Sequence, residues 1–512
     1  MSKYAAVDIG SNSVRMQVAE VIPGSPARVL AAERDVTRLG ESVFRTGRIS
    51  PEALEFTCSQ LRKMAAIYRQ LDVAGIRAVA TSAVRDASNQ KEFLERASEA
   101  AGAAVEVISG QEEARLIQLG VESRWPHKNR RTLVIDVGGG SAELIVSETG
   151  RIVEAFSKPL GAVRLTSVFL THDPPTAKEL HQLEEYIQEK IGAAVARIGR
   201  RRMDRVIATS ASAAAVVGSI NRVARSKREA ADKLRATTPQ VRKFYRDISG
   251  LDLAARKKVR GIGPRRAEII VPGAAVFLKI LEALRLPSIY YSSAGLRDGI
   301  IADLAARGVG RERAQLTPEQ RRSVEEMARR YGVPVKHARK VAALGRSLFD
   351  SLAPVHRLPL ETGRLLEAAA YLHDVGHFVS DVGHHKHSHY LVSNSDMPGF
   401  TAWERKMTAL LCRYHRKSLP APRHDIFQAL TPEERQTVMR LTPMLRLADG
   451  LDRSHDQRVE GIACQMRNGG VTVKVESAVD TDLEMWAAER VAELFEQVFA
   501  LQLTITRARK QT

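Results

Sequence analysis

The sequence predicts an α/β protein of several domains, in which a long helical region follows the α/β part. Over residues 1–308, short runs of β-branched or apolar residues alternate with amphipathic stretches, a pattern typical of α/β domains. Beyond about Gly310 the segments become long and helical. At 512 residues the chain is also too long for a single hydrophobic core.

Four domains are expected, over residues 1–125, 126–308, 309–457 and 458–512. The first opens with the strands YAAVDIG and VRMQVAEV, followed by a helix from Pro51, whose proline suits a first helical turn. IRAVATSA and AVEVIS are further short strands. The second domain opens at Thr132 with TLVIDVGGG, followed by the strand AELIVSE.

The openings of these two domains, AVDIGSNSVRMQVAE and VIDVGGGSAELIVSE, look like copies of one unit. An Asp-x-Gly sequence after a strand is a common tight turn, so either copy alone has that ordinary explanation. Both copies, however, have the same order of strand, Asp, x, Gly, small polar residue and second strand. This agreement predicts a duplicated strand–turn–strand unit.

The third domain begins with TPEQRRSVEEMARRYG, where Thr317 can cap a helix and Pro318 fills its first turn. Eleven of the 14 histidines lie from His337 onward. From about Val459 the pattern becomes mixed: IACQMRNGGVTVKVES is typical of a hairpin around a Gly-Gly turn, and a helix and the strand LQLTITRA follow. A small α/β element is therefore expected after the helical domain.

Composition favours a cytoplasmic protein with an anionic partner. The sequence has no run of 18 apolar residues and no leader with a cleavage site, which argues against membrane insertion and secretion. Cys58, Cys412 and Cys464 form no CxxC pair, so neither a disulfide framework nor a cysteine zinc site is indicated. The net charge of +19 favours nucleic acid, polyphosphate or a nucleotide as partner, without choosing among them.

The two glycine-rich turns, from Asp8 to Ser13 and from Asp136 to Ser141, are candidate phosphate sites. Glycines let backbone N–H groups approach a phosphate closely. The aspartate that opens each turn would repel phosphate unless a cation lies between them. We expect Asp136 and Glu143 to hold Mg²⁺, although an isolated strand glutamate is more often simply solvated.

The segment VISGQEEARLIQLGV places Glu112 and Glu113 in the first turn of a helix. Acids in a first turn are ordinary helix design, because the macrodipole favours negative charge there. The functional interpretation is that one of the two faces a cleft and takes a proton from an attacking water.

Seven motifs in order, AVDIGSNSVRM, ATSAVRDASN, ISGQEEARLI, VIDVGGGSAEL, KPLGAVRLT, GIGPRRAEIIVPG and SSAGLRDGII, resemble those of the exopolyphosphatase/guanosine pentaphosphatase family. This family lies within the actin, sugar-kinase and Hsp70 superfamily, and the resemblance covers nearly all of residues 1–305. It implies two ribonuclease-H-like lobes whose phosphate loops face each other across a cleft.

The resemblance also implies roles for individual residues. Glu113 corresponds to the catalytic base, Asp136 and Glu143 to the residues linked to Mg²⁺, and Arg85 to an arginine that contacts substrate phosphate. A guanidinium suits bidentate phosphate binding. The loop residues expected to cradle phosphoryl oxygens are Ser11, Asn12, Ser13, Gly138, Gly139, Gly140 and Ser141.

These residues suit Mg²⁺-dependent hydrolysis, which needs an in-line water, charge neutralisation and positioning. We expect release of terminal phosphate from inorganic polyphosphate, with removal of the 5′-phosphate of guanosine pentaphosphate as an alternative on the same cleft. A non-hydrolytic sensor of polyphosphate or of an alarmone nucleotide is a third possibility, against which the intact acidic residues argue. The resemblance further suggests a homodimer.

The histidine-rich segment LLEAAAYLHDVGHFVSDVGHHKHSHYLV contains the pair His373–Asp374, which resembles the HD phosphohydrolase superfamily. That resemblance implies a possible second divalent metal held by His337, His373, Asp374 and Asp449. His385 or His387, with His415, is expected to complete a second metal position. The alternative is a relic domain whose histidines stabilise helix contacts or bind polyphosphate.

The segment from Asn221 to Arg266 holds 15 Lys/Arg against four Asp/Glu. Such runs are usually solvated helix faces, and here we expect one that also guides a long polyanion toward the cleft. Apart from Phe244 and Tyr245 the segment lacks aromatic residues, so it is poorly suited to stacking on the bases of nucleic acid.

Overall fold

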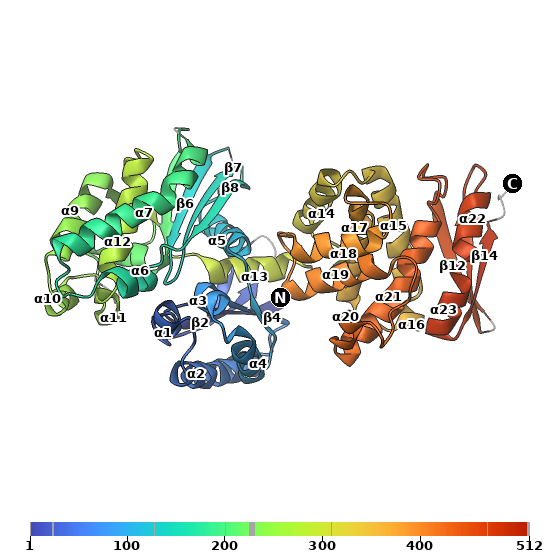
Figure 1. The fold of residues 1–512 in the computed structure, drawn as a ribbon, viewed down its shortest axis with the longest axis horizontal. Helices are drawn as coiled ribbons and strands as arrows, with labels where there is room; N and C mark the ends of the chain where they lie inside the picture. Colours follow the sequence, from blue (N-terminus) through green and yellow to red (C-terminus); the bar gives the residue numbers. More distant parts are fainter. Residues whose placement is uncertain are drawn as a thin grey trace. The chain divides into compact units, whose positions relative to one another are not determined.

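The computed structural model describes residues 2–22, 25–126, 129–199, 201–224, 231–308, 310–467 and 469–508. The chain forms two compact units, Met1–Ala306 and Arg307–Thr512 (Figure 1). None of the described helices is long and apolar enough to cross a bilayer.

The first unit contains two mixed sheets, one in each lobe. The first sheet has the order β3-β2-β1-β4-β5 and the second the order β10-β11-β9-β6-β7-β8. The strands of the first sheet are β1 (Ser2–Ile9), β2 (Val14–Val21), β3 (Arg28–Asp35), β4 (Gly75–Ala80) and β5 (Val105–Val107). Those of the second are β6 (Arg131–Val137), β7 (Ala142–Glu148), β8 (Arg151–Lys158), β9 (Arg205–Thr209), β10 (Arg235–Thr237) and β11 (Ser288–Tyr291).

The two sheets repeat one topology. In each, the first strand pairs antiparallel with the next strand and parallel with a later one, β1 with β2 and β4, and β6 with β7 and β9. This arrangement confirms the predicted α/β lobes and the duplicated strand–turn–strand unit. The register of the two hairpins is also equivalent, since Asp8 lies opposite Arg15 and Asp136 lies opposite Glu143.

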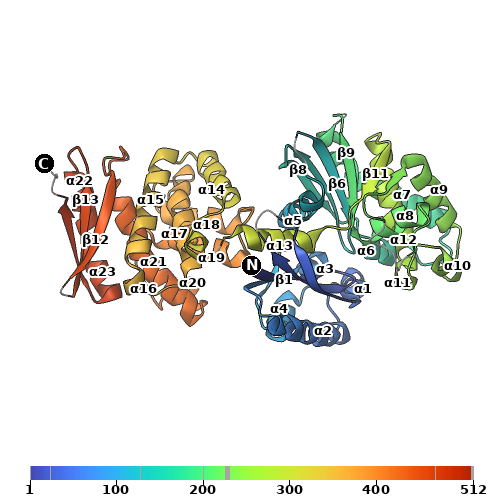
Figure 2. The same cartoon turned by 180° about the vertical axis from the view of Figure 1, so that it is seen from behind.

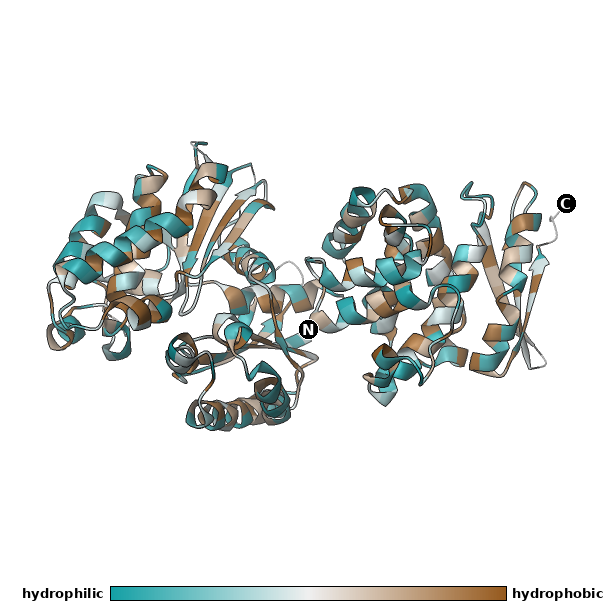
Figure 3. Cartoon of the chain, viewed as in Figure 1, coloured by the Kyte–Doolittle hydropathy of each residue, from teal (hydrophilic) through white to brown (hydrophobic). Residues whose placement is uncertain are grey.

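Helices surround each sheet and bury one apolar face against it. The helices of the first lobe are α1 (Leu39–Thr46), α2 (Pro51–Gln70), α3 (Ser82–Asp86), α4 (Gln90–Ala101) and α5 (Gly110–Arg124). Those that follow are α6 (Ala162–Phe169), α7 (Ala177–Ile198), α8 (Ser210–Ile220), α9 (Thr238–Ser249), α10 (Leu253–Lys258), α11 (Pro264–Ala267), α12 (Ile270–Ala283) and α13 (Leu296–Ala306). Hydrophobic residues line strands β6 and β7, whereas α7 carries many hydrophilic residues on its outer side (Figure 3).

Helices α5 and α13 cross so closely that only glycine fits at the crossing (Figure 2). A Cβ atom at Gly120 would lie 2.0 Å from the carbonyl oxygen of Gly295, and one at Gly299 would lie 1.7 Å from that of Leu116. Real side chains cannot tolerate such distances to backbone atoms, so this contact fixes the position of α5 and of its first turn.

The second unit is mainly helical and ends in a three-stranded sheet of order β12-β13-β14. Capping boxes at Thr317, Thr401 and Thr431 start three of its helices. The helices with a role below are α14 (Pro318–Arg330), α15 (Val335–Ser351), α17 (Gly363–Leu372), η4 (Val375–Phe378), α18 (His384–Asn394), α19 (Ala402–Tyr414) and α21 (Pro432–Gly450). The terminal element consists of β12 (Gly461–Arg467), β13 (Gly470–Glu476), α22 (Asp482–Glu489), α23 (Ala492–Phe499) and β14 (Gln502–Arg507).

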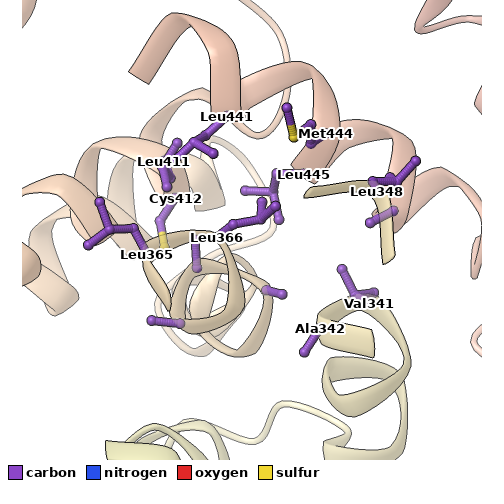
Figure 4. Close-up of a cluster of buried hydrophobic side chains, with 14 of the residues drawn as sticks. Val341, Ala342, Leu348, Leu365, Leu366, Leu411, Cys412, Leu441, Met444 and Leu445 are labelled. Carbon is purple, nitrogen blue, oxygen red and sulfur yellow. The ribbon is translucent and has the colours of Figure 1, made fainter. Parts of the chain in front are cut away.

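One hydrophobic core runs through the second unit. Figure 4 shows its centre, where side chains of α15, α17, α19 and α21 meet, among them Val341, Leu366, Leu411 and Leu445. Val473, Phe495 and Ile505 of the terminal element belong to the same core, so this element packs directly on the helices.

Candidate active site

The two glycine-rich loops meet in the first unit and have the same turn geometry. The amide of Gly10 donates to the carbonyl of Ser13 over 3.1 Å, and that of Gly138 donates to the carbonyl of Ser141 over 3.0 Å. A Cβ atom at Gly140 would lie 2.5 Å from Ser11 Oγ, so the tips of the loops are in contact. The predicted phosphate loops therefore face each other.

Residues that follow each hairpin in the sequence donate hydrogen bonds to its loop. The amide of Gly40 donates to the Ser11 carbonyl over 2.7 Å, and that of Val163 donates to the Gly139 carbonyl over 2.9 Å. Arg164 joins the lobes, because its Nε atom donates to the Gly140 carbonyl over 2.8 Å and its Nη2 atom donates to Ser82 Oγ over 3.0 Å. The carbonyl groups of Ser11, Gly139 and Gly140 thus each accept a hydrogen bond from outside their own loop.

A cavity of about 120 Å³ lies between the loops, large enough for a phosphoryl group and a few waters. Most of the predicted site residues line it, namely Ser11, Asn12, Ser13, Glu113, Asp136, Gly138, Gly139, Gly140 and Ser141. Glu143 and Arg85 do not line the cavity.

Glu112 and Glu113 face different surroundings, which settles which acid enters the cleft. Glu112 accepts hydrogen bonds from Arg77 Nη2 over 3.0 Å and from Arg115 Nε over 2.7 Å, and both arginines also pair with Asp303. Glu113 is 7% exposed, and its Oε2 atom has no hydrogen-bond partner. Glu112 therefore belongs to a buried ion-pair network, whereas Glu113 lines the cavity.

Four buried or half-buried carboxylates gather around this cavity. Burial raises the pKa of Glu113 to about 7, with Asp8 and Asp136 adding to the rise and Arg85 opposing it. Burial also raises the pKa of Asp136 to about 7, opposed by Arg15. Burial together with Glu113 and Asp136 raises the pKa of Glu143 well above its ordinary value. A pKa near 7 suits a general base at neutral pH.

Glu143 lies behind the loop, not on the cavity surface. It is 1% exposed, and its Oε1 atom accepts a hydrogen bond from Ser157 Oγ over 2.8 Å. Its position opposite Asp136 on the β6–β7 ladder places it next to the residue that does line the cavity. The Glu143 carboxylate can thus contribute to a cation site at Asp136 from behind the loop.

The carboxylates fit a divalent cation with a preference for oxygen ligands. Several acids with raised pKa values in one buried space repel each other unless protons or a cation compensate their charge. Carboxylate oxygens are ligands that Mg²⁺ prefers. Asp8, Asp136 and Glu143 are the residues that would hold the ion.

Arg85, at the end of α3, contacts Glu113 and does not line the cavity. Its Nη1 atom donates to the Ile108 carbonyl over 2.6 Å and lies 3.5 Å from Glu113 Oε2. The Arg85 side chain is 27% exposed, so part of it remains open to a ligand.

Several lining residues were missed by reasoning from the sequence. They are Arg15, Thr81, Thr209, Ser210, Arg266, Ser293, Arg297 and Asp298. Arg266 lies in the motif GIGPRRAEIIVPG and Arg297 in SSAGLRDGII, so these motifs carried the signal. Arg15 belongs to the first hairpin, whose equivalence to the second offered a further signal.

In the second unit the structure brings together the four predicted residues His337, His373, Asp374 and Asp449. His373 Nε2 lies 3.3 Å from Asp449 Oδ1 and 3.6 Å from Asp374 Oδ2. Burial alone would raise the pKa of Asp449, but the neighbouring imidazoles of His337 and His373 hold it well below its usual range.

The predicted partners of a second metal position need correction. His377, His384 and His415 surround the other oxygen of Asp374, and neither His385 nor His387 does so. Helix α18 begins at His384, directly after Gly383 in the left-handed conformation. Successive helical residues point about 100° apart, so His384 and His385 face different neighbours, and His387 lies almost one turn farther along the helix.

The basic segment from Asn221 to Arg266 is only partly exposed. Residues 225–230 lie outside the described part of the chain. Arg242 and Lys243 are exposed but pair with Glu282 and Asp247, respectively. Phe244 and Tyr245 are buried, so neither offers a stacking surface.

The family model for the Ppx/GppA phosphatase family matches residues 17–307, and the model for Ppx/GppA phosphatase, domain III, matches residues 320–491. A guanosine-5′-triphosphate,3′-diphosphate pyrophosphatase of Aeromonas hydrophila is 28% identical over 485 residues, which cover 94% of this chain and 91% of the relative.

Solved structures resemble the first unit. The Aquifex aeolicus PPX-GPPA enzyme is 29% identical, with a TM-score of 0.52 over 59% of this chain and 99% of that structure. An exopolyphosphatase from Cytophaga hutchinsonii shares the fold at 24% identity, with a TM-score of 0.55 over 59% of this chain and 97% of that structure. The facing loops, the acid between them and these matches lead to one conclusion: the chain belongs to the Ppx/GppA phosphatase family.

Proposed function

We propose that this protein is a Mg²⁺-dependent phosphoanhydride hydrolase that releases terminal orthophosphate from inorganic polyphosphate. The observation that carries the proposal is the buried carboxylate of Glu113, which lines a cavity between two facing phosphate loops and whose Oε2 atom accepts no hydrogen bond, with Arg85 Nη1 3.5 Å away. A buried carboxylate oxygen without a hydrogen bond is costly, so a ligand that supplies one is expected there. A water aligned for attack on a phosphoryl group supplies that bond.

The residues divide the work of hydrolysis. The amides of the two loops bind the oxygens of the terminal phosphoryl group, and Glu113 takes the proton from the attacking water. Arg85 keeps part of the Glu113 population ionised and offers its exposed side to substrate phosphate. Bound Mg²⁺, held by Asp8, Asp136 and Glu143, would neutralise charge on the phosphate oxygens.

The lining of the cavity favours polyphosphate. Loop glycines and serines, carboxylates and arginines make up most of its wall, which suits the end of a phosphate chain better than a purine base. Its aromatic lining residue, Tyr291, is 1% exposed and so presents no stacking face. The cavity thus recognises a terminal phosphate without reading what is attached to it.

Guanosine pentaphosphate is a second candidate, supported by two observations. The similarity to the Aeromonas hydrophila pyrophosphatase extends over 94% of this chain. A second cavity, of about 130 Å³, shares Ala211 and Arg266 with the first. Its described lining is mostly alanine, glycine and valine, with Arg34 and Arg265, and this suits a flat group next to phosphates.

The deciding experiment measures phosphate release from long-chain polyphosphate and from guanosine pentaphosphate, with and without Mg²⁺. We expect Mg²⁺-dependent release with the higher kcat/KM on polyphosphate, and loss of release in Glu113→Gln. A higher kcat/KM on the nucleotide would select the second candidate. Binding of either compound without turnover would instead indicate a sensor.

A further inference from the structure

Arg164 binds the second phosphate loop through both its backbone and its side chain. Its amide donates to the Gly139 carbonyl over 3.1 Å, and its Nε atom donates to the Gly140 carbonyl over 2.8 Å. The residue lies in the first turn of α6, and the preceding Gly161 is so close to the same loop that a Cβ atom would not fit. These contacts fix the Arg164 guanidinium relative to the loop.

The other side of the guanidinium binds the first lobe. Its Nη2 atom donates to Ser82 Oγ over 3.0 Å and pairs with the Asp86 carboxylate. Its central carbon lies 4.0 Å from the centroid of the Phe44 ring. One guanidinium makes all these contacts because it is planar, carries donors along its edges and stacks on aromatic faces.

Both partners of the Nη2 atom belong to α3, and this short helix has two further contacts with the site. The amide of Ala83 donates to Ser11 Oγ, in the first phosphate loop, over 3.2 Å. Arg85 Nη1 lies 3.5 Å from Glu113 Oε2. Arg164 therefore connects the second loop to the helix that binds the first loop and that carries Arg85.

Little apolar surface joins the lobes at this point. Phe44 of the first lobe packs on a cluster of only three buried residues of the second, namely Ala162, Val163 and Ile269. The lobes share more apolar contact through α5, where Leu116 belongs to a core with the first sheet and Ile117 to a core with the second. Near the loops, the contact between the lobes thus depends on the polar bonds of Arg164.

Arg164 acts on the site from outside the cavity. Its side chain is 19% exposed, and the residues that line the cavity between the loops do not include it. A side chain in this place can set the spacing of the loops, but it does not touch a phosphoryl group bound between them. This separates Arg164 from the loop residues and from Glu113.

We propose that Arg164 is a positioning residue, which holds α3 of the first lobe against the second phosphate loop and so sets the spacing of the two loops. The inference rests on the proposed function, in which a terminal phosphoryl group binds amides of both loops at once. Without Arg164 the loops spend less time at the spacing that binds substrate. Apparent affinity falls in proportion to the population of the binding state, so KM rises, whereas saturating substrate restores the spacing and kcat changes little.

Arg164→Gln is compared with Arg38→Gln in steady-state kinetics. We expect Arg164→Gln to raise KM for polyphosphate about tenfold, the scale of one charge-assisted hydrogen bond, with kcat changed by less than about threefold. Arg38 also joins the lobes, through Glu268 at 3.1 Å, but its side-chain hydrogen bonds go to Glu41 and Glu268 and not to a loop. Arg38→Gln is therefore the matched control, with an unchanged KM.

Chemical rescue separates the geometry of the guanidinium from its charge. Arg164→Lys keeps the positive charge, but a single ammonium does not reproduce the planar set of donors, so its KM should stay raised. Guanidinium ion added to Arg164→Ala should lower KM again, and ammonium ion should not. If the Arg164 variants do not fold, Asp86→Asn decides the same question, because its side chain is 42% exposed and it removes one partner of Arg164. A raised KM is expected there as well.

The spacing itself is measured without substrate by double electron–electron resonance. Spin labels at Lys91→Cys in α4 and Glu189→Cys in α7 report on the two lobes, since both side chains are exposed. The labels are placed in a Cys464→Ser background, because the other two cysteines are buried. We expect a broader distribution of label distances in Arg164→Gln than in the wild type.

Each result bears on the proposal. A KM and a distance distribution that both match the wild type in Arg164→Gln overturn it. A large loss of kcat at unchanged KM also overturns it, because Arg164 would then act on the chemical step. A wild-type KM in Arg164→Lys reduces the role to charge and overturns the geometric assignment. Failure of the proposed function gives a different result, since the wild type then releases no phosphate from polyphosphate, and the label distances alone decide whether Arg164 sets the spacing.

Discussion

Glu113 and Glu112 are consecutive in helix α5, yet one lines a cavity between two phosphate loops and the other lies in a network of buried ion pairs. Helical geometry produces this difference, because neighbouring residues point about 100° apart. The proposed catalytic role therefore belongs to Glu113 and the structural role to Glu112. A substitution of one residue serves as the control for the same substitution of the other.

Glu113→Gln is expected to lower kcat for phosphate release about a thousandfold, since a positioned base contributes roughly 10²–10⁴-fold. Its stability should hold or rise, because a neutral amide costs less to bury than a carboxylate. Glu112→Gln should instead lower the free energy of unfolding by about 3 kcal/mol, the scale of breaking a buried ion pair, with kcat little changed. Steady-state kinetics and urea unfolding measure both quantities. A similar kcat loss in the two variants would contradict the assignment.

The pH dependence follows from the pKa of about 7 at Glu113 and Asp136. Activity at limiting Mg²⁺ should rise with pH through about 7, because the base acts only when ionised. The free energy of unfolding should instead fall as pH rises through about 7. A carboxyl whose folded pKa is raised above its ordinary 4.5 stabilises the fold fully below that value and loses this contribution as pH rises through about 7.

Arg85→Gln checks the origin of this profile. Arg85 opposes the rise in the pKa of Glu113, so its loss should move the acidic limb of the rate profile to higher pH. Arg96→Gln, an exposed arginine of the same lobe paired with Glu55, should leave the limb in place. Rate profiles of the two variants that shift equally would show that Arg85 acts only through overall charge.

Gly161→Ala should distort the second phosphate loop. An added Cβ would lie 2.2 Å from the amide nitrogen of Gly140, and backbone at this position cannot move without displacing the loop. We expect a cost of about 1–3 kcal/mol in stability together with a marked loss of kcat/KM. Gly192→Ala, exposed in α7 with no atom near the new methyl group, should stabilise the protein by about 0.5–1 kcal/mol at unchanged kcat/KM.

Asp136→Asn should raise the Mg²⁺ concentration required for half-maximal phosphate release by at least about tenfold, because even outer-sphere partners of a metal are worth about 10–100-fold in affinity. Removal of Mg²⁺ by EDTA should abolish release in the wild type. Asp247→Asn removes a surface carboxylate of the same lobe and serves as the control. An unchanged Mg²⁺ requirement in Asp136→Asn would place the ion elsewhere.

The sequence predicted the lobes and the loops because the pattern of each lies within a short stretch of chain, whereas the choice of Glu113 over Glu112 came from the family resemblance. Strand periodicity and the repeated Asp-x-Gly turn defined the loops around Ser11 and Gly139 without tertiary information. Arg266 and Arg297 were not recognised, because they reach the cavity only when residues far along the chain fold back between the loops. The choice of His384 over His385 depended on where one helix begins, a boundary that a sequence leaves uncertain by more than one residue.

The hairpins of the two lobes agree in register but differ in charge, since Arg15 stands opposite Asp8 where Glu143 stands opposite Asp136. Identical hairpins would give the groove a two-fold axis, and a phosphate chain could then enter with either wall next to its last bond. The exchange of acid for base at one ladder position removes that axis. Under the proposed function, the basic side chain of Arg15 on one wall only would orient the end of a phosphate chain, so chain ends are expected to enter in one direction.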